Sequence, residues 1–366
     1  VVNNLKVYGV ENIKEVIEFF NNERNLEPSI VNTREEFYEH QSSFPYDFAD
    51  VKGQESVKRA LEVAASGGHN LIMIGSPGSG KSMMAKCMPS ILPPLSLGES
   101  LETTKIHSVA GKLGKDSSLI AIRPFRSPHH TISQVAMVGG GTNPQPGEIS
   151  LAHNGLLFLD ELPEFNRSVL EVLRQPLEDR YISISRAKYS LDYPASFMLV
   201  ASMNPCPCGY YNHPTRACVC NPGQVQRYLN RISGPLLDRI DIQIEIVPVP
   251  FEKMAEQHHA ESSASIRKRV IKARKIQAQR FANHPGIYCN AQMEAGLLHL
   301  YAQPNEAGLK LLQTAMTRLN LSARAYGRIL KVARTIADLD NSEHITSIHL
   351  AEAISYRNLD REDWAG

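Results

Sequence analysis

The stretch NLIMIGSPGSGKS, residues 70–82, decides the fold of this chain. Residues 70–75 form a short apolar run of the kind that makes a buried parallel strand. Residues 75–82 match the pattern G-x-x-x-x-G-K-[ST], whose glycines let backbone N–H groups turn inward toward phosphate at the start of a helix. A simple glycine turn is the alternative, but the flanking strand and helix favour a phosphate-binding loop.

The side chains of this loop suit a nucleotide with its magnesium ion. Lys81 would neutralise charge on the β- and γ-phosphates, and Ser82 would hold Mg²⁺. The candidate nucleotide ligands are Gly75, Ser76, Pro77, Gly78, Ser79, Gly80, Lys81 and Ser82.

Further positions offer the groups that phosphoryl transfer to water requires. The run LLFLDEL, residues 156–162, ends a strand in Asp160 and Glu161, one for Mg²⁺ and one for the attacking water. Taken alone, such a pair is a solvated strand end. Asn204 ends another apolar run and can hydrogen-bond the water or the γ-phosphate. Arg239 is at a helix-to-strand turn, where it either forms a surface ion pair or reaches the γ-phosphate of a neighbouring subunit.

The order of apolar runs predicts an α/β sandwich with a parallel sheet. Runs at residues 70–75, 155–161 and 196–204 alternate with helical patterns at 56–66 and 168–179. Ligands of such folds bind beyond the carboxyl ends of the strands. After residues 241–251 the pattern is helical, which predicts a second, all-helical domain. Helices are expected at residues 264–282, 291–301, 305–319, 322–339 and 346–356.

Composition places few limits on function. The chain has 366 residues, 42% hydrophobic and 21% charged, as in an ordinary soluble globular protein. A net charge of +1 gives no global reason to expect nucleic acid, so any such surface must be local. No apolar run reaches the roughly 18 residues of a membrane span. Cys87 and Cys289 stand apart from the other cysteines, which suggests a reducing compartment and hence the cytoplasm.

These motifs in this order resemble the AAA+ ATPases, specifically the magnesium-chelatase-like group and most closely the ComM/YifB competence-protein family. The resemblance covers about residues 45–358. The strings that carry it are DVKGQESVKRALEVAASGGHN (50–70), RSPHHTIS (126–133), VGGGTNPQPGEISLAHNG (138–155), NPCPCG (204–209), SGPLLDRID (233–241) and SARAYGRILKVARTIADL (322–339).

The resemblance implies a domain plan and an activity. The AAA+ core would occupy residues 50–251 with hairpin insertions, and a helical lid would occupy 252–366. Residues 28–49 would be a linker, and 1–27 would be the last strand and helix of a Lon-like domain. The implied activity is ATP-driven translocation on DNA by a hexameric ring, used for branch migration in recombination during natural transformation. Two alternatives are a chelatase-type motor that remodels a partner protein and a scaffold that binds ATP without useful turnover.

The resemblance also assigns residues. It places Asp50, Val51 and Gln54 on the adenine side of the nucleotide. Arg239 becomes the arginine finger, and Asn204 the first sensor. Arg324 becomes the second sensor, although Arg328, one helical turn further on, could reach a similar place, and Arg324 could equally be a solvated charge on the lid.

Three segments are candidates for DNA contact. Residues 180–196 read as a hairpin with Arg186 and Lys188 at its tip, and such hairpins face the central pore in rings of this group. In the loop 123–141, Arg126, His129 and His130 offer polar donors, and the two histidines could instead bind a metal. The helix 264–282 has seven Lys/Arg and no acid, and its basic face could bind DNA or the next subunit.

Four of the six cysteines lie close together in the sequence, as C-x-C pairs separated by nine residues. Brought together by a loop, Cys206, Cys208, Cys218 and Cys220 could offer four thiolates to a structural Zn²⁺. His213 is an alternative ligand, and a metal-free ordered loop is the alternative structure. The segment 206–220 is therefore predicted to be an insertion in the ATPase core.

Overall fold

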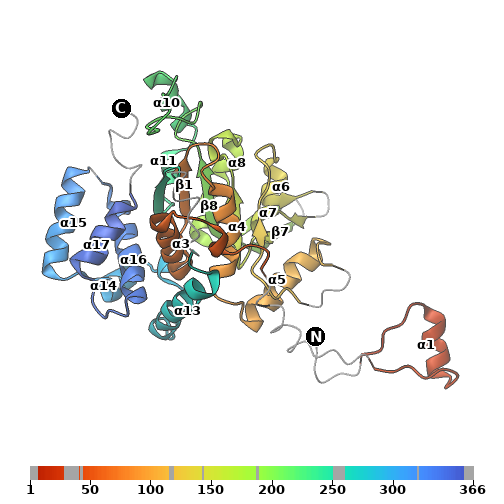
Figure 1. The fold of residues 1–366 in the computed structure, drawn as a ribbon. Coiled ribbons are helices and arrows are strands. Elements are labelled where there is room, and N and C mark those ends of the chain that lie inside the picture. Colours follow the sequence, from red (N-terminus) through yellow and green to blue (C-terminus); the bar gives the residue numbers. More distant parts are fainter. Residues whose placement is uncertain are drawn as a thin grey trace.

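A parallel sheet forms the centre of the protein in a computed structural model (Figure 1). The structure describes residues 7–28, 41, 44–114, 119–141, 144–186, 189–249, 260–319 and 321–357. The five strands of the sheet run in the order β2-β5-β8-β1-β9, and every neighbouring pair is parallel. They are β1 (Leu71–Gly75), β2 (Phe125–Arg126), β5 (Leu156–Leu159), β8 (Met198–Met203) and β9 (Ile242–Ile246). The predicted α/β class is confirmed.

Helices cover both faces of this sheet, which explains why its central strands are buried and mostly apolar. Every residue of β1, β5 and β8 is buried. Leu71 and Met73 of β1 belong to one hydrophobic cluster, together with α3 (Glu55–Gly67) and α4 (Lys81–Ile91). Ile72 and Ile74 belong to a second cluster on the opposite face. The helices of that face are α7 (Glu148–Leu151), α8 (Arg167–Glu171) and α9 (Arg174–Asp179).

The single helix expected at residues 168–179 is broken into α8 and α9. Pro176 explains the break, because it has no N–H to donate to the carbonyl of Val172 and its ring would clash with that carbonyl. The strand expected before the first helix, α1 (Ile13–Phe20), is absent from the described residues 7–12.

The C-terminal part is helical, as predicted, and forms the teal α13 and the blue helices of Figure 1. Its helices are α13 (Ser263–Arg280), α14 (Ala295–Tyr301), α15 (Glu306–Arg318), α16 (Ala323–Leu339) and α17 (Ser347–Ser355). The apolar sides of α13 and α16 belong to the same cluster as α3 and β1. Ser263 at the start of α13 also accepts a hydrogen bond from the Phe48 amide at 2.8 Å. The helical part and the core therefore share one hydrophobic interior, and the domain division at residue 251 stays a prediction.

Shorter elements connect these parts. They are η1 (Phe48–Asp50), α5 (Leu97–Val109), α6 (Gln134–Val138), β3 (Gly139–Gly140), β4 (Gln145–Pro146), η2 (Leu162–Glu164), α10 (Pro222–Leu229), α11 (Gly234–Leu237) and η3 (Asn290–Gln292). Strands β6 (Tyr181–Arg186) and β7 (Tyr189–Pro194) pair antiparallel as a hairpin. None of the helices in the described ranges has the length and apolar character needed to cross a membrane.

Candidate nucleotide-binding site

The predicted phosphate-binding loop follows β1 and leads directly into α4. Two of its glycines are required by the geometry. Gly80 has φ of 90°, a left-handed conformation that side chains disfavour. A Cβ on Gly75 would lie 2.7 Å from the Ile246 carbonyl oxygen of β9, so only glycine allows the two strands to approach this closely.

Lys81 is buried at the centre of this loop. Its Nζ donates to the carbonyl oxygens of Gly75 and Ser76 at 2.7 and 2.9 Å, and to Asn204 Oδ1 at 3.3 Å. Burial lowers the pKa of Lys81, and the nearby Asp160 and Glu161 carboxylates oppose that shift. The predicted partners Lys81 and Asn204 are thus brought together, although they are 123 residues apart in the chain.

Asp160 follows β5 and contacts hydroxyls from two other elements. Ser82 Oγ, in the first turn of α4, donates to Asp160 Oδ2 at 2.7 Å. Ser202 of β8 donates to the other oxygen, Oδ1. A hydroxyl and a carboxylate at this separation are hard oxygen donors that suit Mg²⁺. Ser202 is not among the predicted site residues, because a serine inside an apolar strand carries no recognisable motif.

Glu161 lies beside Asp160 but points elsewhere. Its backbone is left-handed, with φ of 56°, and its carboxylate is largely exposed. Oε2 of Glu161 is 3.8 Å from Nδ1 of His130, in the loop that follows β2. His130, predicted as a DNA contact, is therefore next to the predicted catalytic carboxylate. His129 stacks on His130 with ring centroids 4.1 Å apart.

The residues assigned to the adenine side lie near the end of β9. Val51 is buried directly after η1, and Asp50, the last residue of η1, is exposed. Gln54 Nε2 donates to the Val247 carbonyl oxygen at 2.6 Å. The structure thus holds the Gln54 side chain at the residue that follows β9, the strand that pairs with β1.

Arg239 is bound within its own chain. It forms an ion pair with Glu178 of α9 at 2.7 Å, and its Nη1 donates to the Pro235 carbonyl oxygen at 2.6 Å. Its Nε is buried and has no hydrogen-bond partner among the residues that the structure describes. The predicted role of Arg239 in a neighbouring subunit's site stays a prediction.

The two arginines considered for the second sensor differ in environment. Arg324 is exposed and pairs with Asp238 at 3.0 Å. Arg328 pairs at 2.7 Å with Asp241, which is buried and also contacts His69 at 3.2 Å. Burial alone would raise the pKa of Asp241, but the Arg328 charge and the His69 hydrogen bond hold it well below the usual range. Arg328 therefore neutralises the buried charge of Asp241. Arg324 has only an exposed ion pair to break, so it can reorient toward a nucleotide more easily than Arg328 can.

Replacing Arg328 by Met should lower the free energy of unfolding by about 3 kcal/mol, because it strands a buried carboxylate. The matched variant Arg324→Met should cost less than about 1 kcal/mol, since its ion pair is exposed. Asp241 stabilises the fold at pH above its unfolded pKa of about 4, and this contribution is lost as the pH falls through the depressed folded-state pKa. The loss caused by Arg328→Met should therefore shrink in acid. Urea unfolding at neutral and acid pH measures both effects, and equal costs for the two variants would contradict this assignment.

The DNA-contact candidates are not gathered on one surface by the described contacts. Arg126 forms a bidentate ion pair with Glu148, at 2.6 and 2.7 Å. Arg186 ends β6, opposite Tyr189 in the hairpin, and Lys188 lies outside the described residues. The hairpin itself is formed as expected, while DNA contact by any of these residues stays a prediction.

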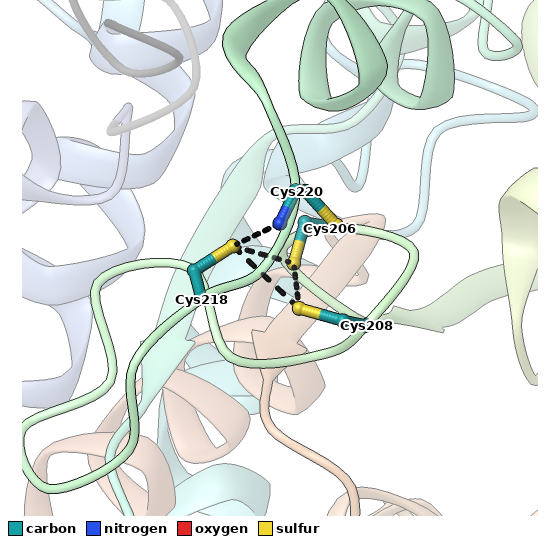
Figure 2. A group of neighbouring side chains, drawn as sticks. All are labelled: Cys206, Cys208, Cys218 and Cys220. Atoms are coloured by element: carbon teal, nitrogen blue, oxygen red, sulfur yellow. Dashed lines mark hydrogen bonds between the residues drawn. The ribbon is translucent and has the colours of Figure 1, made fainter.

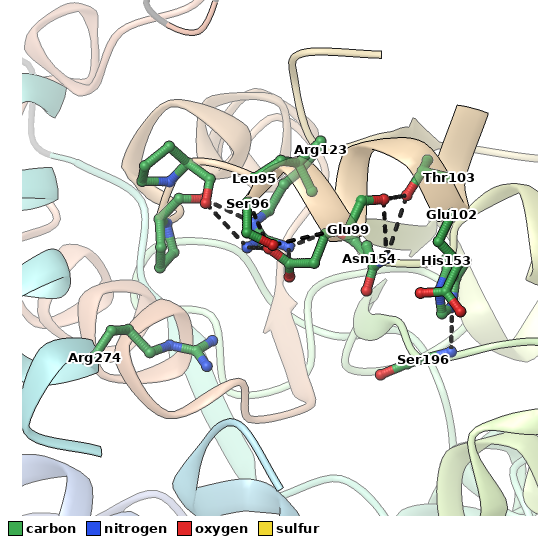
Figure 3. Close-up of polar contacts among 12 residues, drawn as sticks. Leu95, Ser96, Glu99, Glu102, Thr103, Arg123, His153, Asn154, Ser196 and Arg274 are labelled. Atoms are coloured by element: carbon green, nitrogen blue, oxygen red, sulfur yellow. Dashed lines mark hydrogen bonds and ion pairs between the residues drawn. The ribbon is translucent and has the colours of Figure 1, made fainter. Parts of the chain in front are cut away.

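Several arginines that could have bound DNA instead bind acceptors within the chain. Figure 3 shows Arg123, which pairs with Glu99 at 2.9 Å and donates to the Asn154 carbonyl oxygen at 2.8 Å. The basic helix α13 behaves in the same way, because its four arginines bind acceptors within the chain. These arginines are Arg267, Arg269, Arg274 and Arg280. Its exposed cations are Lys268, Lys272 and Lys275.

The four clustered cysteines converge, as Figure 2 shows. Their sulfur atoms all lie within 4.8 Å of one another, and the Cys206–Cys208, Cys208–Cys218 and Cys206–Cys218 contacts are 3.3, 3.5 and 3.7 Å. Sulfurs around a tetrahedral Zn²⁺ with bonds of about 2.3 Å are about 3.8 Å apart. Across the described residues this is the one group of three or more His, Cys, Asp or Glu side chains close enough for a metal, and it includes neither His213 nor the two loop histidines.

A parallel sheet that carries this loop, these carboxylates and this asparagine at its carboxyl edge is the arrangement of a nucleotide-binding protein of the AAA+ class. The family model described as "Magnesium chelatase, subunit ChlI" matches residues 47–254, and "Magnesium chelatase, subunit ChlI C-terminal" matches 260–357.

Individual relatives show to which group of magnesium-chelatase-like proteins the chain belongs. The protein YifB of Salmonella typhimurium is 49% identical over 86% of this chain, and that of Escherichia coli is 48% identical over 86%. The competence protein ComM of Haemophilus influenzae is 42% identical over 98% of the chain. The chain belongs to the ComM/YifB family of magnesium-chelatase-like proteins, which confirms the resemblance. It spans 61% of the length of each YifB protein and 69% of ComM.

Proposed function

We propose that the protein hydrolyses ATP to move along branched DNA as a hexameric ring, in recombination during natural transformation. The observation that carries the ATPase part is the convergence of Lys81, Asn204, Ser82 and Asp160 from three separate elements. Similarity to a protein named for competence supports the DNA part.

The proposed mechanism divides the work among residues of this chain. Lys81 and Asn204 bind the γ-phosphate, and Ser82 and Asp160 would hold Mg²⁺, which when bound neutralises phosphate charge. Glu161 accepts the proton of the attacking water, since its exposed carboxylate lies next to the metal-binding Asp160. Arg239 of a neighbouring copy stabilises the charge that develops on the γ-phosphate, and Arg324 acts as the second sensor.

Assembly into a ring would couple ATP hydrolysis to DNA binding. If Arg239 and Lys81 complete a site only across two copies, each hydrolysis event changes a contact between subunits. The hairpin of β6 and β7 follows α9 directly in the chain, and Glu178 of α9 forms the ion pair with Arg239. Movement of Arg239 toward a neighbour's nucleotide would therefore shift Glu178 and α9, and with them the hairpin that we propose contacts DNA.

Replacing both Arg186 and Lys188 by Gln should weaken binding to four-way DNA by about tenfold or more and lower the salt dependence of binding. Each lost phosphate contact reduces the slope of log K against log salt by about one. Gel shifts with a non-hydrolysed ATP analogue over a salt series measure this. The control is Lys310→Gln, which removes an exposed cation from α15. Unchanged affinity and slope in the double variant would remove the hairpin from the DNA surface.

A chelatase-type motor that remodels a partner protein is the second candidate. The 38 kDa subunit of magnesium chelatase from Rhodobacter capsulatus is 25% identical over 44% of the chain, and supports this alternative. The same gel shifts separate the two functions, because a chelatase-type motor would show no salt-sensitive DNA binding.

We also propose a structural Zn²⁺ at Cys206, Cys208, Cys218 and Cys220. Their spacing supports it, as does a backbone N–H that reaches one of the sulfurs: Cys220 N donates to Cys218 Sγ at 3.4 Å. None of the six cysteines forms a disulfide, which suits the reducing cytoplasm that we propose as the site of action.

A further inference from the structure

The segment that carries the clustered cysteines, residues 205–221, lies against the phosphate-binding loop; we call it the cysteine loop. It starts directly after Asn204, whose side chain accepts from Lys81. Gly209 provides the second connection. A Cβ built on Gly209 would lie 2.5 Å from Cδ and 2.8 Å from Cγ of Pro77, so the backbone at residue 209 packs directly on the proline of the phosphate-binding loop.

A small cavity marks the same boundary. Gly75 and Ser76 line it from the phosphate-binding loop, and Gly209 and His213 from the cysteine loop. Val247, the residue just after β9 whose carbonyl accepts from Gln54, completes the wall. The cysteine loop therefore contacts the phosphate-binding loop and also borders Val247, the hydrogen-bond partner of Gln54.

Within the described part of the chain, sulfur contacts are what join the two halves of the cysteine loop near Pro77. Cys206 and Cys208 lie in the half next to Gly209, and Cys218 and Cys220 lie in the returning half. The other side-chain hydrogen bonds of the loop either link residues 210–216 to one another, as in the contact of Arg216 with the Tyr210 hydroxyl at 2.7 Å, or cap α10 through Asn221. Neutral thiols hold such a junction weakly, whereas four bonds to a metal would fix it.

We propose that the metal-bound cysteine loop braces the phosphate-binding loop, so that Zn²⁺ at the four sulfurs and nucleotide at Lys81 strengthen each other's binding. The inference rests on the proposed nucleotide binding. Its physical basis is that Zn²⁺ fixes Cys206 and Cys208, which hold Asn204 on one side and Gly209 against Pro77 on the other. Because coupling between two binding sites is reciprocal, each ligand must change the affinity of the other by the same factor.

Titration with a fluorescent ADP analogue tests one direction. The protein should purify with one Zn²⁺ per chain, and removing it with a chelator should weaken ADP binding by roughly tenfold, restored by Zn²⁺ alone. The opposite direction is read from the equilibrium affinity for Zn²⁺ in competition with a chromogenic chelator. Saturating ADP should tighten zinc binding by the same factor. A protein that takes up no Zn²⁺, or that loses Zn²⁺ with no change in ADP affinity, would overturn the brace.

Variants keep the test independent of the chelator. Cys218→Ser with Cys220→Ser should lose both the zinc and the added ADP affinity, while Cys289→Ser removes a buried cysteine outside the cluster and should lose neither. If the double variant does not fold, Gly209→Ala serves instead. It leaves all four sulfurs in place but adds a methyl group against Pro77, so it should keep its zinc and bind ADP more weakly.

Failure of the brace can be told apart from failure of the proposed function. ADP binding that is normal and independent of zinc would reject the brace and leave the ATPase intact. Absence of ADP binding in zinc-loaded protein would reject the proposed nucleotide site itself, and the brace with it.

Discussion

Replacing Glu161 by Gln should lower kcat for ATP hydrolysis by about 100-fold or more and leave ATP affinity within about threefold. The Glu161 carboxylate follows Asp160 directly in the chain and is largely exposed, so it can accept a proton from water, whereas Asp160 itself receives hydrogen bonds from Ser82 and Ser202. Binding should survive, since Lys81 and the loop backbone supply the phosphate contacts. The variant should therefore hold ATP and favour the assembled state.

Phosphate release under saturating ATP and equilibrium binding of a fluorescent ATP analogue measure the two quantities separately. Glu164→Gln is the matched control, because Glu164 lies three residues further on and pairs with Arg231 at 2.8 Å. It should hydrolyse ATP at close to the normal rate. If Glu161→Gln retained more than about a tenth of the wild-type rate, another group would have to be the proton acceptor.

The phosphate-binding loop was predictable because one local pattern specifies one conformation. The G-x-x-x-x-G-K-S spacing fixes where backbone N–H groups, Lys81 and Ser82 lie relative to the helix start, without help from the rest of the chain. Asp160 and Asn204 were predictable only because they end apolar strands, and parallel strands bring their carboxyl ends to one edge. Ser202 was not, since its contact with Asp160 depends on the register between β5 and β8.

The arginines show the limit of reading charge from sequence. The sequence around Arg126 and Arg267 does not show whether these arginines are exposed to solvent, where they could bind DNA, or paired within the chain. Each is engaged because a partner arrives from far along the chain: Glu148 for Arg126, and the Leu92 carbonyl for Arg267. The three lysines of α13, whose compact ammonium groups are more strongly hydrated than guanidinium groups, remain exposed. The contact of Gly209 with Pro77 could not be predicted either, because no sequence pattern links the two loops that it joins.

Replacing Arg239 by Ala should lower ATP hydrolysis by about 1,000-fold and leave ATP binding nearly unchanged, if Arg239 acts on a neighbour's nucleotide. In the single chain its guanidinium is largely buried and is held by the exposed Glu178 carboxylate and by the Pro235 carbonyl oxygen, so the arginine must break both contacts to reach a neighbour's phosphate. The alternative is a purely structural ion pair, whose loss would lower stability and affect activity only through folding. Thermal unfolding of the variant, and of Glu178→Gln, checks that alternative.

Mixing two inactive variants decides between action within a chain and action across an interface. An Arg239→Ala chain retains Glu161, and a Glu161→Gln chain retains Arg239, so neighbours in a head-to-tail ring can complete one another's sites. In an equimolar, randomly mixed ring, half the sites have Glu161 and half of those face an intact arginine, which predicts recovery to about a quarter of the wild-type rate. If both groups had to come from one chain, no mixture could recover activity, because neither variant carries both.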